Sequence, residues 1–404
     1  MGRRFSWSLA IAAALILLIT MGGRQTIGLF IAPLDEATGL GIVSISLAVA
    51  IGQLVWGFAQ PVFGGFADRF GTGKVIALGG IMLAAGLALT PFVHSEWALI
   101  ATLGVISAFG AGAGSLSILI GAVSQRIAPE QRSNAAGFIN AGGSLGQFVF
   151  APLVQLAIVG LGWVNAMLML AAAMLTTLPL AWPLRRREPA AANAAHARSH
   201  PEIGLRRQLA VAVRDRSYWW LNLGFFTCGF HVAFLVTHLP GEVRLCGLSP
   251  SIAANSLAII GVANIAGSLG AGWLGGRYRM KHLLFWIYLV RAAAVLGYMM
   301  APKTATTFYV FAVALGLSWL ATLPPTAGIV GKLFGVRYLA TLLGVSLAVH
   351  QLGGFYGAWL GGIAVTTFGD YNWMWYADAL LATAAAICNL PIREARLIRA
   401  PAAA

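Results

Sequence analysis

Two related stretches of this 404-residue chain place chemically active side chains inside apolar surroundings. Residues 22–33 hold Arg24, and residues 229–240, which follow 207 positions later, hold His231 in the place of Arg24. A guanidinium is a planar charged fork that holds a carboxylate through two hydrogen bonds. Because an arginine in hydrocarbon costs at least ~2.5–3.5 kcal/mol, Arg24 predicts an anion-binding site. The alternative is a structural arginine bonded to helix carbonyls.

Histidines within apolar segments can carry a proton, because an imidazole titrates in the working pH range. His231 is the first candidate for proton coupling and His350 the second. Asp35 is a further candidate, as a relay at the outer end of its helix. The alternative for each histidine is a packed, hydrogen-bonded core residue. We interpret His238 as a rim residue and Asp378 as structural.

Four further side chains are candidates for the wall of a substrate cavity. Asn140 and Gln147 interrupt one glycine-rich apolar segment, and Tyr356 lies in another. Small residues at spacings of three and four let helices pack closely, and polar groups on such helices can line a cavity. Trp319, just before Pro324-Pro325, predicts a kinked helix whose freed carbonyls face the pathway or a neighbouring group.

The composition is that of an integral membrane protein. The chain is 59% hydrophobic and 9% charged, with a mean hydropathy of +0.81, and lacks the polar surface of a soluble domain. The net charge of +14 lies mainly in loops, linker and tails, which indicates membrane orientation and excludes nucleic acid as the partner. The three cysteines have neither disulfide nor metal spacing. We expect no cofactor, no metal and no enzymatic activity, since no catalytic constellation or nucleotide loop is present.

Twelve apolar stretches are long enough to span a bilayer, which predicts an all-α membrane protein with two pseudo-symmetric six-helix bundles. We expect an N-terminal bundle over 1–183, a linker over 184–216 and a C-terminal bundle over 217–404. The repeat at 207 residues predicts that helix one corresponds to seven, four to ten and five to eleven. The stretches are 8–34, 43–64, 74–94, 97–122, 133–159, 163–183, 218–243, 250–274, 282–300, 305–331, 338–366 and 373–391.

Basic residues gather in alternate loops, which predicts the orientation of the chain. Arginines and lysines follow helices two, four, eight and ten, while the opposite loops carry most of the acids. By the positive-inside rule, both termini and the linker are predicted to be cytoplasmic. We therefore expect a protein of the bacterial cytoplasmic (inner) membrane that functions as a monomer in the lipid bilayer.

The loop Gly64–Lys74 resembles the signature loop of the major facilitator superfamily, and this resemblance covers nearly the whole chain. It implies a transporter in which Asp68, Arg69 and Lys74 form a charge network that gates the two halves. One departure is Thr72-Gly73, where basic residues are usual. The second half carries Gly275-Gly276 in place of the Asp-Arg pair, so we expect a weaker latch there. In this superfamily helix nine lies outside the core, which implies a structural or gating role for Arg291.

Residues 23–30 are similar to the first helix of monocarboxylate transporters and their bacterial relatives, which include oxalate/formate exchangers. In the animal members an Asp and an Arg of helix eight take part in proton-coupled transport. The corresponding stretch here begins at Asn264 and lacks both charges, which leaves Asn264 as a polar candidate for the substrate site.

We therefore predict a secondary active transporter for a small, monocarboxylate-like organic anion, working by alternating access and coupled to proton symport. The alternatives are exchange of organic anions of the oxalate/formate type and proton-antiport efflux of drugs or metabolites. A membrane receptor is the third class, but the linker is too short for a signalling domain.

Overall fold

The computed structural model describes residues 7–124, 132–185, 205–335 and 338–394, and this part of the chain is helical with no strand. The first half contains α1 (Trp7–Gln25), η1 (Ile27–Phe30), α2 (Ile31–Thr38), α3 (Ile42–Phe70), α4 (Thr72–Leu89), η2 (Thr90–Phe92), α5 (Glu96–Leu99), η3 (Ile100–Ser107), α6 (Ala108–Ala113), α7 (Leu116–Ser124), α8 (Arg132–Leu161), α9 (Trp163–Leu175), α10 (Thr177–Leu180) and η5 (Trp182–Arg185). The second half contains α12 (Leu205–Arg214), α13 (Arg216–Leu245), α14 (Pro250–Gly275), α15 (Met280–Met300), α16 (Ala305–Ser318), α17 (Leu323–Phe334), α18 (Leu339–Phe368) and α19 (Asn372–Asn389).

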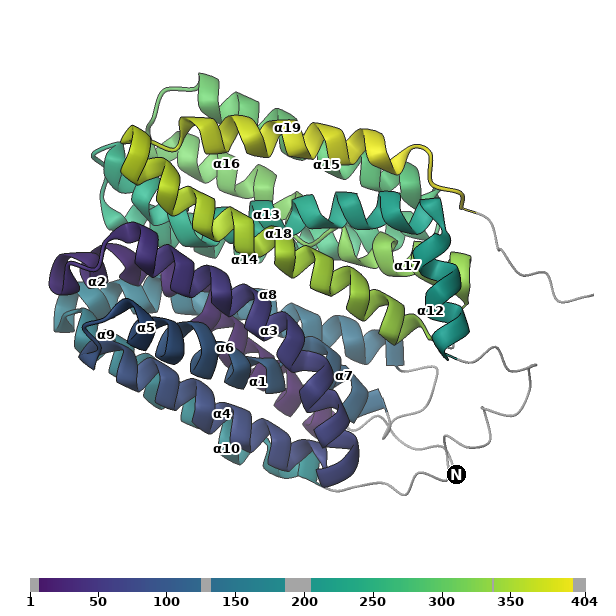
Figure 1. The fold of residues 1–404 in the computed structure, drawn as a ribbon, viewed down its shortest axis with the longest axis horizontal. Helices are drawn as coiled ribbons and strands as arrows, with labels where there is room; N and C mark the ends of the chain where they lie inside the picture. The colour runs from purple at the N-terminus through teal and green to yellow at the C-terminus, as the bar shows by residue number, and fades with distance from the viewer. Residues whose placement is uncertain (1–6, 125–131, 186–204, 336–337, 395–404) are drawn as a thin grey trace, which may run out of the picture.

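The long helices lie side by side, with the first half against the second (Figure 1). Ten of the described helical segments are long and apolar enough to cross a membrane. The remaining two predicted spans correspond to α18 and α19, which pack against α13 and α15. The all-α prediction is thus confirmed. We call the end where α1 begins and α19 stops the terminal face, and the other end the opposite face.

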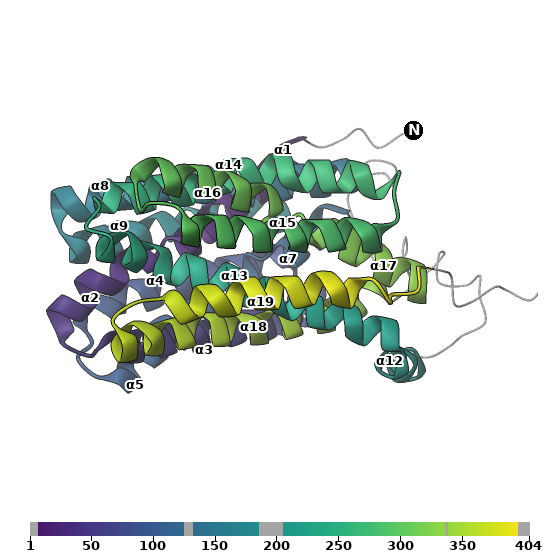
Figure 2. The ribbon, with the colours of Figure 1, turned by 90° about the horizontal axis from the view of Figure 1, so that it is seen from above.

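The linker contains a helix that the sequence did not predict. Helix α12 lies at the terminal face and projects to the side of the long helices (Figure 2). Its Gln208 is buried and donates to the carbonyl oxygen of Phe334 at 3.1 Å, which ties α12 to the end of α17. The boundaries of linker and bundles remain predictions.

Glycines allow the central helices of each half to touch backbone to backbone. A Cβ on Gly146 of α8 would lie 2.1 Å from the carbonyl oxygen of Leu18 in α1. A Cβ on Gly353 of α18 would lie 2.0 Å from the carbonyl oxygen of Phe226 in α13. Gly146 and Gly353 are separated by the 207 residues of the sequence repeat. The same close contact is therefore used in both halves.

The two halves meet along two pairs of helices, α3 with α18 and α8 with α14. Gly362 of α18 leaves room for the side chain of Ser46 on α3, since a Cβ would lie 2.5 Å from the Ser46 hydroxyl. Between α8 and α14, Asn264 Nδ2 donates to Ser144 Oγ at 2.8 Å. The contact between halves therefore combines small residues with a few hydrogen-bonded polar pairs.

Two of the long segments are interrupted at points that bear on function. The predicted tenth span breaks between Ser318, where α16 ends, and Leu323, where α17 begins. This confirms the kink expected next to Trp319. The first span also breaks, directly after Gln25, which the sequence analysis did not foresee.

We predict that the Gly146→Ala variant lowers the free energy of unfolding by about 1–3 kcal/mol, because the added methyl group must force α1 and α8 apart. Gly137 lies on the same helix with nothing within 4 Å of an added Cβ, so Gly137→Ala is the matched control. Thermal unfolding of both purified variants measures the difference. Equal midpoints for the two variants would contradict the close contact.

Candidate functional site

Arg24 lies where the first span stops being a regular helix. Helix α1 ends at Gln25, and the hydroxyl of Thr26 donates to the carbonyl oxygen of Gly23 at 2.9 Å. The backbone then continues as η1, where Gly28 packs against α13: a Cβ there would lie 2.1 Å from the carbonyl oxygen of Val236. Because the first and seventh spans touch here, the guanidinium is placed at the junction of the two halves.

The guanidinium of Arg24 is held by two side chains of α3. Its Nη2 donates to Oε1 of Gln53, and the guanidinium carbon lies 4.1 Å from the centre of the Trp56 ring. An aromatic face stabilises a cation by roughly 0.5–2 kcal/mol. Neither partner carries a negative charge, so the positive charge of Arg24 is oriented without being neutralised.

A cavity of about 50 Å³ lies next to this guanidinium. Its polar lining comes from Arg24, Gln53, Ser107 and Thr237, and its apolar lining from α4, η3 and α13. A guanidinium has five N–H donors, and the described contacts use only part of them. The remaining donors allow a small anion to form charge-assisted hydrogen bonds in this space.

The other predicted lining residues of α8 and α14 lie at the contact between halves. The Oδ1 atom of Asn264 accepts from the backbone N–H of Leu320 at 2.9 Å, besides the bond of Asn264 to Ser144. Gln147 is buried, and its Nε2 has no partner in the described part of the chain. Asn140 is half-buried. None of the three lines the cavity beside Arg24.

Helix α18 does not bring its predicted residues to Arg24 either. His350 is buried against Phe225, with ring centres 4.8 Å apart, and its Nδ1 is 3.3 Å from Nε2 of Gln351. Tyr356 is 39% exposed and packs beside Phe226. Tyr356 does not line the cavity beside Arg24.

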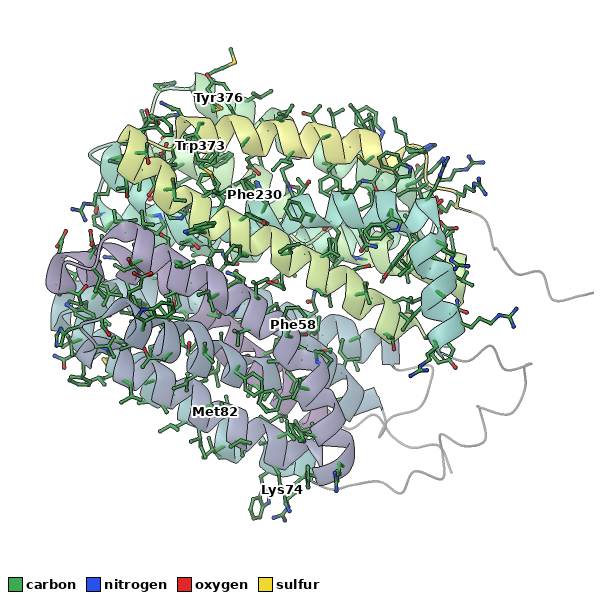
Figure 3. All side chains as sticks on the ribbon, viewed as in Figure 1. Phe58, Lys74, Met82, Phe230, Trp373 and Tyr376 are labelled. Atoms are coloured by element: carbon green, nitrogen blue, oxygen red, sulfur yellow. The ribbon has the colours of Figure 1, made fainter. Side chains whose placement is uncertain are left out.

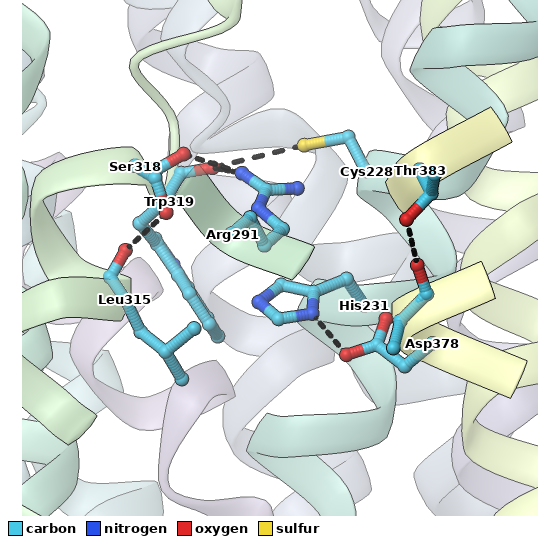
Figure 4. A network of polar contacts seen from close by, with 9 residues as sticks. Cys228, His231, Arg291, Leu315, Ser318, Trp319, Asp378 and Thr383 are labelled. Atoms are coloured by element: carbon cyan, nitrogen blue, oxygen red, sulfur yellow. Dashed lines mark hydrogen bonds and ion pairs between the residues drawn. The ribbon is translucent and has the colours of Figure 1, made fainter. Parts of the chain in front are cut away.

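The predicted proton candidate His231 has a partner that sequence reasoning missed. Its Nδ1 lies 2.6 Å from Oδ2 of Asp378 on α19, and both side chains are completely buried (Figure 4). The ring of Trp319 stands 5.7 Å from the imidazole. His231 is thus turned toward α19 and does not line the Arg24 cavity. Asp378, interpreted from the sequence as structural, is thus the buried partner of His231.

Arg291 is completely buried beside this pair (Figure 4). Its Nη2 donates to the carbonyl oxygens of Ser318 and Trp319, the latter at 2.9 Å. These carbonyls are the ones left free where α16 ends, as expected for a break inside a membrane. The structural or gating role predicted for Arg291 remains a prediction.

Two other predicted residues lie near the opposite face. Asp35 accepts a hydrogen bond from the backbone N–H of Gly41 at 2.9 Å and so closes the turn after α2. His238 is 2% exposed, and its Nε2 lies 2.7 Å from the carbonyl oxygen of Ala358. His238 thus lies toward the outer end of α13, but its side chain is covered by α18.

The predicted gating residues lie at the terminal face. Lys74 is exposed and points away from the bundle (Figure 3), and the guanidinium of Arg69 is 5.3 Å from the Phe70 ring. The side chain of Asp68 lies outside the described part of the structure. In the second half, Lys332 Nζ is 2.5 Å from Oε1 of Glu394, which also accepts from the backbone N–H of Lys281. In the second half, Glu394 thus supplies a carboxylate at the terminal face, where Gly275-Gly276 replaces the Asp-Arg pair of the first half.

Comparison with known proteins gives a single family. The model of the Major Facilitator Superfamily matches residues 13–358. Monocarboxylate transporter 13 of Rattus norvegicus is 26% identical over 379 residues, which cover 91% of this chain and 84% of that protein. The oxalate:formate antiporter of Oxalobacter formigenes is 24% identical over 378 residues, with coverage of 90% and 86%. The solved D-xylose-proton symporter matches the fold with a TM-score of 0.76 at 15% identity, with coverage of 96% and 98%.

We predict that the Glu394→Gln variant loses part of the acid sensitivity of the wild type. Burial alone would raise the pKa of Glu394, but the hydrogen bonds from Lys332 and the backbone outweigh it and lower the pKa below its ordinary value of 4.5. A lowered pKa in the folded state stabilises above the unfolded pKa, and this stability is lost as the pH falls through the folded value. We expect the variant to unfold roughly 1–2 °C below wild type at pH 7 and to match it near pH 3.

The control for this measurement is Glu36→Gln, which removes the exposed ion pair of Glu36 with Arg244 at 2.8 Å. Solvent screens that pair, so its removal should leave the thermal midpoint nearly unchanged at either pH. If the difference in thermal midpoint between wild type and Glu394→Gln did not change with pH, the ion pair assigned to Lys332 and Glu394 would be contradicted.

Proposed function

The chain belongs to the Major Facilitator Superfamily and is an integral membrane transporter, not an enzyme, and we propose that its substrate is a small organic anion bound by Arg24. In this proposal the anion occupies the cavity between α1, α3 and α13, at the junction of the two halves. Alternating exposure of this junction to the two sides of the membrane moves the substrate.

The observation that carries this proposal is that no described partner of Arg24 neutralises its positive charge. Its described partners, Gln53 and Trp56, are both uncharged, and a cavity adjoins the guanidinium. A cation in this setting is stabilised further by a bound carboxylate, which a planar guanidinium holds through two hydrogen bonds. The names of the two relatives, a monocarboxylate transporter and an oxalate:formate antiporter, support the same class of substrate.

We propose proton symport as the mode of transport, in the bacterial inner membrane with both termini cytoplasmic. Anion exchange is the second mode, which the oxalate:formate antiporter supports by its name. Efflux by proton antiport is a weaker alternative, since a cationic drug would be repelled by Arg24. Proteoliposomes that contain the purified protein distinguish the modes: symport needs a pH gradient, and exchange needs a carboxylate on both sides.

We predict that Arg24→Ala abolishes uptake and counterflow of a panel of small carboxylates comprising formate, oxalate, lactate and pyruvate. Loss of one partner of a buried charged pair costs about 2–5 kcal/mol, which is at least roughly 30-fold in affinity. Arg24→Lys keeps the charge without the two-pronged geometry and should retain weak transport. If Arg24→Ala transported any carboxylate of the panel at the wild-type rate in sealed vesicles, the proposal would be contradicted.

We further predict that Asp68→Asn slows turnover while the affinity for the carboxylate stays within about twofold of wild type. Asp68 lies at the end of α3 on the terminal face, far along the helix from Gln53 beside the cavity. Equilibrium binding and initial transport rates, measured on the same preparation, separate the two effects. An affinity loss as large as that of Arg24→Ala would assign Asp68 to the substrate site instead of the gate.

A further inference from the structure

We propose that the His231–Asp378 pair, between α13 and α19 and beside Arg291, is the proton-binding site of this transporter, separate from the anion site at Arg24. This inference rests on the proposed transport function. Both side chains of the pair are completely buried, and Nδ1 of His231 lies 2.6 Å from Oδ2 of Asp378. Burying a charged carboxylate is expensive, so the presence of Asp378 in an apolar bundle calls for a role beyond packing.

The pair has a free position for a proton. A carboxylate only accepts hydrogen bonds, so the short contact assigns the Nδ1 hydrogen of neutral His231 as the donor to Asp378. The other ring nitrogen, Nε2, has no partner in the described part of the chain. A proton from water can therefore add at Nε2 without breaking the bond to Asp378. The product is an imidazolium–carboxylate pair, in which attraction between two opposite charges is added to the hydrogen bond.

The surroundings of the pair balance its charge. Arg291 from α15 contributes one positive charge, and Asp378 one negative charge, so the cluster is neutral while His231 is neutral. Three other titratable groups lie around it. Cys228 is on α13, with its thiol 3.7 Å from the carbonyl oxygen of Trp319, Tyr288 is on α15 with its ring centre 5.4 Å from the guanidinium carbon of Arg291, and His350 is on α18. Asp378 is the most deeply buried carboxylate of the described residues. It is thus the group that favours a proton on His231 most directly.

The proton site communicates with the anion site through helix α13. His231 and Val236, which lines the cavity, are five residues apart on this helix, a rise of about 7–8 Å. Val236 also contacts the backbone of Gly28 next to Arg24. A stronger bond between His231 and Asp378 pulls α13 toward α19 and so changes the wall of the anion cavity. The two ligands then influence each other's affinity by the same factor, without touching.

The first test needs no substrate. Thermal unfolding of wild type, H231Q, D378N and the double variant between pH 5 and pH 9 forms a double-mutant cycle. We expect a coupling between the two residues that grows about twofold from pH 9 to pH 5, as neutral His231 becomes an imidazolium and the hydrogen bond becomes an ion pair. Coupling that is absent or independent of pH would overturn the proton site and leave the pair structural. If H231Q fails to fold, the pH dependence of wild type minus D378N gives the same decision.

The matched control is H238Q. His238 lies on the same helix and is also buried, but its partner is the carbonyl oxygen of Ala358 instead of a carboxylate. A backbone carbonyl cannot supply the charge that favours an added proton, so the buried neutral His238 costs stability at low pH, and H238Q should gain stability relative to wild type from pH 9 to pH 5, opposite in sign to H231Q. A pH dependence in H238Q equal to that in H231Q would show that any buried histidine of α13 suffices, and would overturn the assignment.

The second test uses proteoliposomes and the labelled carboxylates of the panel. With a lower pH outside, H231Q and D378N should lose accumulation against a gradient at least tenfold, while counterflow falls less than fivefold. Arg24→Ala should lose both. Accumulation by H231Q and D378N equal to wild type would overturn the proton site alone. If the coupling between His231 and Asp378 depended on pH but wild type transported none of the carboxylates, the anion proposal would be overturned and the proton site would stand.

Discussion

A charged side chain inside hydrocarbon has no solvent to stabilise it, and the polar architecture of this protein follows from that constraint. Arg24 and Arg291 both lie where a spanning helix is interrupted. Arg291 binds carbonyls freed at the end of α16, while Arg24 follows two glycines at the end of α1 and is held from α3. An interrupted helix exposes polar backbone groups, and a buried arginine is one means of satisfying them. At the break between α16 and α17, the freed carbonyls and the Arg291 charge therefore stabilise each other.

Arg291 and Arg24 differ in how their charges are stabilised inside the membrane. The guanidinium of Arg291 is completely buried and bonds two carbonyl oxygens next to the His231–Asp378 pair, so its charge is balanced by fixed groups. Arg24 is half-buried, with only the neutral Gln53 and Trp56 as described partners and a cavity beside it. In the proposed function, Arg291 is part of the framework and Arg24 is the cation that binds an exchangeable anion.

The sequence predicts the framework well because bilayer thickness and hydropathy act locally. Span positions, the repeat at 207 residues and the break near Trp319 all follow from local patterns. The partners of the charged groups do not, because they depend on how each helix is rotated against its neighbours. Gln53, a polar residue in the middle of an apolar span, carried a usable signal. Asp378 did too, as a carboxylate within a span must find a partner, but nothing local indicates that the partner is His231.

The separation of the two proposed sites also bears on the energetics of coupling. A protonated imidazole in contact with Arg24 would place two positive charges together, whereas beside Asp378 it has a carboxylate within hydrogen-bonding distance. With one anion at Arg24 and one proton at His231, the loaded protein has the same net charge as the empty one. A proton alone leaves two uncompensated positive charges inside the membrane, one at Arg24 and one in the cluster of His231, Asp378 and Arg291, which the low dielectric makes costly. A bound anion removes one of these charges, so the anion favours the proton even though the two sites share only a helix.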